Sequence, residues 1–184
     1  MTTQGKPKRM PGDPSAPTRR RRMIRVDQAG EYGAVRIYQG QLAVLAGTAS
    51  EPAIRRMAEQ ERTHLEKFDA LLVENKVRPT ALMPLWHVAG FVLGAGTALL
   101  GERAAMACTV AVEEVIDEHY RGQLDRLDDT DGDLKGTVAQ FRQDELDHRD
   151  EALARGAREA PAYEALSAVV KTGSRLAIWL SERF

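Results

Sequence analysis

Two stretches of the chain carry the same pair of residues at helical spacing: ERTHLEKFDALL at residues 61–72 and DELDHRDEALAR at residues 144–155. Glu61 and His64 are three positions apart in the first stretch, as are Glu145 and His148 in the second. Residues three apart on an α-helix lie on one face, so each pair can point at a common centre. For one pair alone we would favour a solvated glutamate beside a partly exposed histidine, because surface helices produce this spacing by chance.

The surroundings of the two pairs argue against that simpler interpretation. Apolar residues flank both pairs on the same helical stripes: Met57, Phe68, Phe141 and Ala152. A glutamate on a buried stripe is costly unless it is paired or binds a metal. Two more glutamates lie on apolar stripes upstream, Glu31 at 30 residues before Glu61 and Glu113 at 32 residues before Glu145. The chain therefore contains two copies of one unit, a helix with one inward glutamate followed by a helix with an inward Glu-x-x-His.

Four carboxylates and two imidazoles converging in a four-helix core are the ligand set of a carboxylate-bridged di-iron or di-manganese site. Four carboxylates balance two divalent metals and can bridge them, while each histidine supplies one nitrogen. Open positions on the metals leave room for dioxygen. The predicted ligands are Glu31, Glu61, His64, Glu113, Glu145 and His148, with Glu61 and Glu145 able to bridge. This set accepts iron and manganese alike.

Residues next to the predicted ligands have several interpretations. Glu114 points about a third of a turn away from Glu113, so it faces solvent or lies behind the ligands. Asp144 either accepts a hydrogen bond from a ligand histidine or is a plain surface aspartate. His119 and Tyr120 either line a substrate pocket or belong to ordinary packing.

Length and composition favour one all-α domain. The chain has 184 residues, of which 43% are apolar and only 5% aromatic, and β-branched runs are scarce. The formal net charge of −1 predicts no strong attraction to nucleic acid. The single cysteine, Cys108, excludes an internal disulfide and any cysteine-built metal cluster. Helical stripes, turn residues and prolines predict helices at about 23–49, from 50 to before 79, and at 104–127, 134–155 and 161–183.

Residues 1–22 differ from the rest of the chain. They are rich in Pro, Lys and Arg and have no periodic apolar residues, and they lack the apolar core of a secretory signal. We expect a disordered basic tail over 1–22 and one domain over 23–184. A weaker interpretation of the tail is electrostatic attraction to anionic lipid.

An uncharged stretch, about Thr80–Gly101, separates the two repeated units. It has the length and neutrality of a membrane span. A single crossing would put the two halves of the predicted metal site on opposite sides of the bilayer, so a segment lying on the membrane surface is preferred. The alternative is a hairpin buried in the core. If the stretch touches lipid, a lipid-soluble substrate is expected.

Several blocks resemble the Coq7 family, the demethoxyubiquinone hydroxylases of ubiquinone biosynthesis. They are IRVDQAGEYGAVRIYQGQLAVL (24–45), RPTALMPLWHVAGFVLGAGTALLG (78–101), MACTVAVEEVIDEHY (106–120) and LSERF (180–184). The similarity covers about residues 22–184. It implies a ferritin-like di-iron fold with the same six ligands that the spacing predicts, an inserted membrane-associating segment and an extra C-terminal helix. Arg22, Arg25 and Tyr120 match family positions near the substrate or reductant path.

The resemblance also implies a reaction. A polyprenyl 3-methyl-6-methoxy-benzoquinol would gain one ring hydroxyl from dioxygen at a centre of two irons, with NADH as the electron source. Family members are peripheral membrane proteins, which implies the cytoplasmic side of the inner membrane in a bacterium or the matrix face of the mitochondrial inner membrane in a eukaryote. The proline-rich amino end is more typical of a bacterial protein. Eukaryotic members work with the lipid-binding partner Coq9, and the sequence leaves open whether this chain needs one or forms a homo-oligomer.

Three other functions share part of this pattern. An iron-storage or ferroxidase protein would use the same ligands but needs no apolar entrance. A different di-iron oxidase would act on fatty chains or on ubiquinol directly. A metal-free helical membrane adaptor leaves four inward glutamates unexplained.

Overall fold

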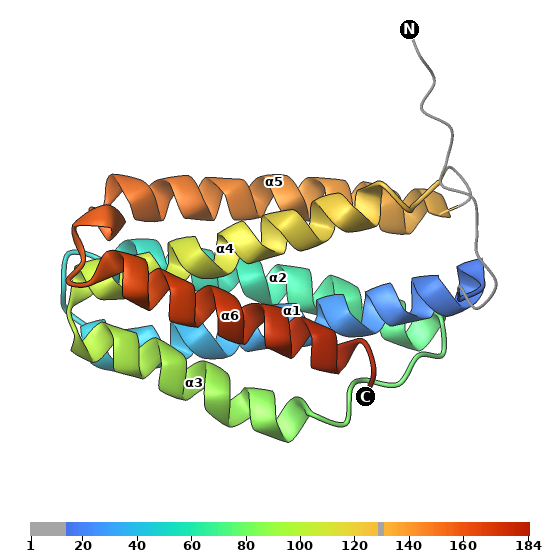
Figure 1. Cartoon of the computed structure of the whole chain (residues 1–184), viewed down its shortest axis with the longest axis horizontal. Helices are drawn as coiled ribbons and strands as arrows, with labels where there is room; N and C mark the ends of the chain where they lie inside the picture. Colours follow the sequence, from blue (N-terminus) through green and yellow to red (C-terminus); the bar gives the residue numbers. More distant parts are fainter. Residues whose placement is uncertain (1–13, 129–130) are drawn as a thin grey trace, which may run out of the picture.

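The computed structural model describes residues 14–128 and 131–184. Within them the chain forms six α-helices and one short 3₁₀ segment, and no strand, which confirms the all-α prediction. Most of the helices run along the long axis of the molecule (Figure 1). Their bounds are α1 Ala16–Leu45, α2 Glu51–Glu74, α3 Met83–Leu99, α4 Glu102–Leu124, α5 Gly132–Ala154, η2 Ala157–Glu159 and α6 Tyr163–Ser181.

The first helix begins earlier than expected. The prediction of a disordered tail through residue 22 is wrong for residues 16–22, which are the first two turns of α1, whereas residues 1–13 lie outside the described residues. Ser15 caps α1, because its side-chain oxygen accepts a hydrogen bond from the Thr18 amide at 3.3 Å. Two arginines of these turns then bind the end of α2: Arg20 donates to the Asn75 side chain, and Arg21 donates to the Lys76 carbonyl at 2.9 Å.

The core helices pack in two groups. In one, α1 packs against α2 and α3; in the other, α4 packs against α5 and α6. The predicted stripe on α2 is confirmed, because each of its five members is at most 1% exposed: Met57, Glu61, His64, Phe68 and Leu71. Met57 belongs to one apolar cluster of the core and Phe68 to another. Glu61 and His64 therefore lie between two apolar layers that shield them from water.

The uncharged stretch is a single helix, α3, that lies along α1 (Figure 1). Close approach of the two helices depends on glycine, since a Cβ at Gly94 would overlap the Ile37 carbonyl oxygen. At the other end of α3, Trp86 donates its indole N–H to Ser181 of α6 at 3.0 Å. The buried-hairpin alternative is wrong, because α3 packs by one face only.

The outer face of α3 is apolar and exposed. Leu85, Val88 and Val92 have relative exposures of 52%, 59% and 60%. Among the described residues, no helix combines the length and apolarity needed to cross a bilayer.

Candidate metal centre

The six predicted ligands meet at the middle of the bundle. Glu31 comes from α1, Glu61 and His64 from α2, Glu113 from α4, and Glu145 and His148 from α5, and each is at most 4% exposed. Their positions follow from local helical geometry, because each lies on the apolar stripe that its helix turns inward. The spacing argument therefore predicted this convergence correctly.

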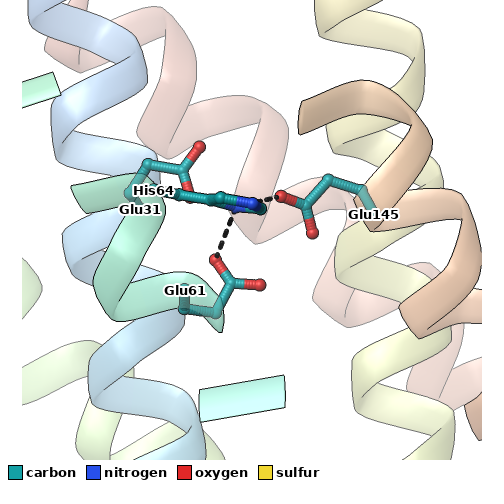
Figure 2. A group of neighbouring side chains, drawn as sticks. All are labelled: Glu31, Glu61, His64 and Glu145. Atoms are coloured by element: carbon teal, nitrogen blue, oxygen red, sulfur yellow. Dashed lines mark hydrogen bonds and ion pairs between the residues drawn. The ribbon is translucent and has the colours of Figure 1, made fainter. Parts of the chain in front are cut away.

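The donor atoms form two overlapping groups. One consists of Glu31, Glu61, His64 and Glu145, the other of Glu61, Glu113, Glu145 and His148, and within each group the atoms lie within 4.8 Å of one another. Glu61 and Glu145 belong to both. In Figure 2 the imidazole of His64 extends between the carboxylates of Glu61 and Glu145, and its Nδ1 lies 3.1 Å from Glu145 Oε1. His148 Nδ1 lies 3.1 Å from Glu61 Oε1 and 3.2 Å from Glu145 Oε2.

Glu31 and Glu113, the two carboxylates that each belong to only one group, accept a hydrogen bond from a tyrosine hydroxyl. Tyr38, seven residues after Glu31 on α1, donates to Glu113 at 3.0 Å. Tyr120, seven residues after Glu113 on α4, donates to Glu31. The two helices thus exchange equivalent hydrogen bonds, as expected for two copies of one unit. Tyr38 was placed in the core by its stripe, but its hydrogen bond to Glu113 was not predicted.

The outward nitrogen of each histidine also has a partner. His64 Nε2 lies 3.1 Å from Asp144 Oδ2, so the hydrogen-bonding interpretation of Asp144 is confirmed. His148 Nε2 lies 3.1 Å from Gln60 Oε1, a contact the sequence analysis missed. Gln60 directly precedes Glu61 just as Asp144 precedes Glu145, and the repeat would have identified it. Nδ1 of each ring lies within hydrogen-bond distance of the shared carboxylates, and because Nε2 is engaged outward, Nδ1 is the nitrogen that would bind a metal.

Burial and mutual charge shift the pKa values of the cluster. Burial, followed by the charge of Glu145, holds the pKa of Glu61 and of Glu113 well above the usual value. Burial also opposes ionisation of Glu145, but hydrogen bonds from His148 and His64 outweigh it and lower its pKa to about 2. Burial disfavours the charged form of both histidines, yet their carboxylate partners raise each histidine pKa to about 11. Without metal, protons held by the two histidines and by Glu61 and Glu113 therefore offset the negative charge that bound cations would otherwise balance.

The donor set fits two divalent cations. Within the described residues, no lysine or arginine pairs with any of the four buried carboxylates. Buried carboxylates need a cation or donors to offset their desolvation. Glu61 Oε1 is fully buried, and the nitrogen of the described residues that lies beside it is His148 Nδ1, at 3.1 Å. Oxygen and imidazole donors at these separations suit iron, manganese or zinc.

Comparison with known proteins gives the family. The family described as ubiquinone biosynthesis protein COQ7 matches residues 18–181, which include all six residues of the cluster. The chain belongs to the COQ7 family. It is 60% identical over 176 residues, 95% of this chain and 83% of the relative, to a protein of Rhodospirillum rubrum named 3-demethoxyubiquinol 3-hydroxylase.

Eukaryotic members of the COQ7 family are also similar. The mouse protein named NADPH-dependent 3-demethoxyubiquinone 3-hydroxylase, mitochondrial, is 54% identical over 167 residues, covering 89% of this chain and 77% of its own length. The yeast protein named 5-demethoxyubiquinone hydroxylase, mitochondrial, is 44% identical over 179 residues, with coverage of 88% and 77%. The resemblance found in the sequence is therefore confirmed. The mouse name specifies NADPH, whereas the resemblance implied NADH.

Other residues singled out in this COQ7-family chain lie around the cluster. Arg22 is exposed, and Arg25 donates to the Arg78 carbonyl at 3.0 Å, so both arginines lie outside the buried centre. Glu114 turns away from it and pairs with Lys171 of α6.

His119 belongs to a buried polar network that the sequence analysis missed. Its Nε2 lies 2.9 Å from Asp27 Oδ1, and Gln123 donates to the same oxygen at 2.6 Å. Burial raises the pKa of Asp27, although the hydrogen bond from His119 opposes the shift. Asp27 stands one helical turn before Glu31, and this i, i+4 spacing was the available signal.

An apolar cavity of about 420 Å³ adjoins the centre. It lies among α1, α3, α4 and α6, and its lining is almost wholly apolar or glycine. A much smaller space, lined by Glu31, Glu113, Tyr120 and others, shares five lining residues with it: Val26, Gly30, Ala34, Ile116 and Ile178. The cavity thus ends beside the buried carboxylates.

Proposed function

We propose that this chain is a ferritin-like di-iron monooxygenase that hydroxylates the ring of a polyprenyl demethoxyubiquinol with dioxygen. The observation that carries the proposal is the pair of four-residue groups that share Glu61 and Glu145. A buried set of this composition, in a chain of the COQ7 family, supports a two-metal site in which Glu61 and Glu145 would serve both metals. The hydroxylase names of the relatives support the reaction class and the substrate.

Each residue has a part in this proposal. Glu31 and His64 would hold one iron, Glu113 and His148 the other, and two bound irons would supply the redox chemistry that activates dioxygen. The hydroxyls of Tyr38 and Tyr120 keep the unshared carboxylates oriented toward the centre. The apolar layers on either side exclude water from the reacting groups.

The cavity supports a substrate with an apolar tail. A volume of about 420 Å³ lies in the range of small-molecule sites, and its wall suits isoprenoid units. A ring placed at the end shared with the smaller space would lie beside the carboxylates, with its tail among α1, α3 and α6. An iron-storage protein needs no such cavity, which disfavours that alternative.

The reaction balances with a two-electron donor. One atom of dioxygen replaces a ring hydrogen as a hydroxyl group, and the other leaves as water with two electrons and two protons. We infer a reduced nicotinamide as the ultimate donor, because the names of several relatives specify NADPH.

We further infer that the protein acts at a membrane surface. The exposed apolar residues Leu85, Val88 and Val92 of α3 are accompanied by Val169 and Trp179 of α6, which are 70% and 48% exposed. Large apolar residues gathered on one side of a small protein mark an interaction site. Trp86, Val169 and other residues of these two helices also line the cavity, so a lipid-soluble substrate could enter from the bilayer directly.

The test is product formation by iron-reconstituted protein. A short-chain demethoxyubiquinone is added anaerobically with NADH or NADPH, followed by isotopically labelled dioxygen, and products are analysed by mass spectrometry. We expect a product containing one labelled oxygen. Glu113→Gln should lose one of the two irons and the product, whereas its neighbour control Glu114→Gln should keep both irons and the product. Iron binding without product would assign the chain to another di-iron oxidase and overturn the proposed reaction.

A further inference from the structure

The two halves of the cluster match in almost every contact. Each half has one unshared glutamate that accepts a hydrogen bond from a tyrosine, and one histidine whose Nδ1 faces the shared carboxylates. Each histidine reaches across to the other Glu-x-x-His helix and contacts the residue just before that helix's glutamate. This exchange follows the internal repeat of the sequence.

The halves differ in charge at the acceptor on the outward nitrogen. His64 Nε2 contacts the carboxylate of Asp144, and His148 Nε2 contacts the side-chain amide oxygen of Gln60, both at 3.1 Å. The two distances are equal, so the difference is one of charge. The Asp144 side chain is 22% exposed, and Gln60 is likewise only half-buried, which leaves room for either side chain to be exchanged for its isostere.

The charge of the acceptor affects the other nitrogen of the ring. A hydrogen bond to a carboxylate is stronger than one to a neutral amide and draws the Nε2 proton further from the ring. The ring becomes a better electron donor at Nδ1, and the outer carboxylate also attracts a cation through space. Removing such an outer partner typically weakens metal binding 10–100-fold.

We propose that the two metal positions are inequivalent, and that the position of Glu31 and His64 binds a divalent cation more tightly than the position of Glu113 and His148. Asp144 is the positioning residue that makes the difference. This inference rests on the proposed function, since it requires that the cluster holds two metals. At limiting metal, the position of Glu31 and His64 fills first.

Another acidic residue lies on the same side of the cluster. Asp27 stands one turn before Glu31 on α1 and is held by His119 and Gln123. The contribution of Asp144 therefore has to be isolated by substituting it alone.

The experiment is anaerobic calorimetric titration of metal-free protein with Fe²⁺. Wild type should bind in two steps of different affinity. Asp144→Asn keeps the shape and removes the charge, so it should weaken the tighter step about 10–100-fold and leave the weaker step unchanged. Gln60→Glu should strengthen the weaker step. Asp147→Asn, an exposed aspartate of α5 that contacts only Gln143 among the described residues, removes the same charge and should change neither step.

Two further variants assign the steps. Glu31→Gln should remove the tighter step and Glu113→Gln the weaker one, because each glutamate belongs to one group only. Two equal steps in wild type, or equal weakening of both steps by Asp144→Asn, would overturn the inequivalence while leaving the proposed function intact. No Fe²⁺ binding by wild type would instead overturn the proposed function and this inference with it.

Discussion

Replacing one glycine of α3 tests how the cavity wall is built. A Cβ at Gly94 would overlap the Ile37 carbonyl oxygen, whereas no atom of the described residues lies within 4 Å of a Cβ at Gly96 on the same helix. To restore an ordinary contact of at least 3.4 Å, α1 and α3 would have to separate by more than about 1 Å. A gap of ~1 Å forfeits about half of the dispersion attraction between facing atoms. The Ile37 carbonyl oxygen belongs to the backbone and cannot rotate away as a side chain can, so a local adjustment does not relieve the overlap.

The expected magnitudes have opposite signs. Overpacking costs about 1–3 kcal/mol, and the neighbour at Gly94 is rigid, so Gly94→Ala should destabilise the fold by about 2 kcal/mol. Gly96→Ala should stabilise it by about 0.5–1 kcal/mol through the lower backbone entropy of alanine in the unfolded chain. For a chain of this size, about 2–4 °C of melting temperature corresponds to 1 kcal/mol. Gly94→Ala should therefore melt about 4–8 °C below wild type, and Gly96→Ala about 1–4 °C above it.

Thermal unfolding followed by circular dichroism measures both variants. Binding of a quinone analogue to each folded variant gives a second readout, because Gly90 and Leu93 of the same helix line the cavity. Gly94→Ala should bind the analogue more weakly, and Gly96→Ala should bind it as wild type does. Equal melting temperatures for the two variants would refute the close packing of α1 on α3.

Three further predictions concern pH, membrane and cavity. In metal-free protein the pKa of His64 and of His148 is about 11, above the ordinary 6.5, so the stability that these ion pairs contribute is full below pH 6.5 and is lost as pH rises toward 11. The melting temperature of chelator-treated protein should fall over that window. A constant melting temperature would contradict these ion pairs. Leu85→Ser should reduce sedimentation with liposomes, while the exposed control Val73→Ser should not, and equal loss would dismiss α3 as the contact. In Gly33→Phe the new phenylalanine ring would occupy part of the open cavity, so the variant should bind a long-tailed quinone more weakly, as measured by fluorescence, and keep the iron content of wild type. Unchanged quinone binding would place the tail elsewhere.

The sequence predicted the cluster well because its signal is local. A glutamate and a histidine three apart share a helix face, and an apolar stripe through them shows that this face is buried, as Glu61 and His64 are. Burial of an acidic side chain needs a strong compensating partner, so its appearance on a stripe is informative. Because the same pattern occurs twice, the positions of Glu31, Glu61 and His64 in the first unit then predicted the matching positions of Glu113, Glu145 and His148 in the second.

Contacts between distant residues could not be read in the same way. Residues 16–22 lack apolar periodicity, and their helix is held by Arg20 and Arg21 at the end of α2, more than 50 residues away in sequence. The Ser15 cap and Pro17 in the first turn were the local signals for this helix start. Similarly, Asp27 becomes buried because His119 and Gln123, about 90 residues later, supply its hydrogen bonds.

The location of bound iron tests the central claim most directly. Crystals of iron-loaded protein can be measured at the iron absorption edge, so that anomalous difference maps show the metal alone. We predict two peaks about 3.5–4 Å apart, one beside Glu31 and His64 and the other beside Glu113 and His148, with Glu61 and Glu145 between them. A single peak, or iron bound away from these residues, would contradict the account.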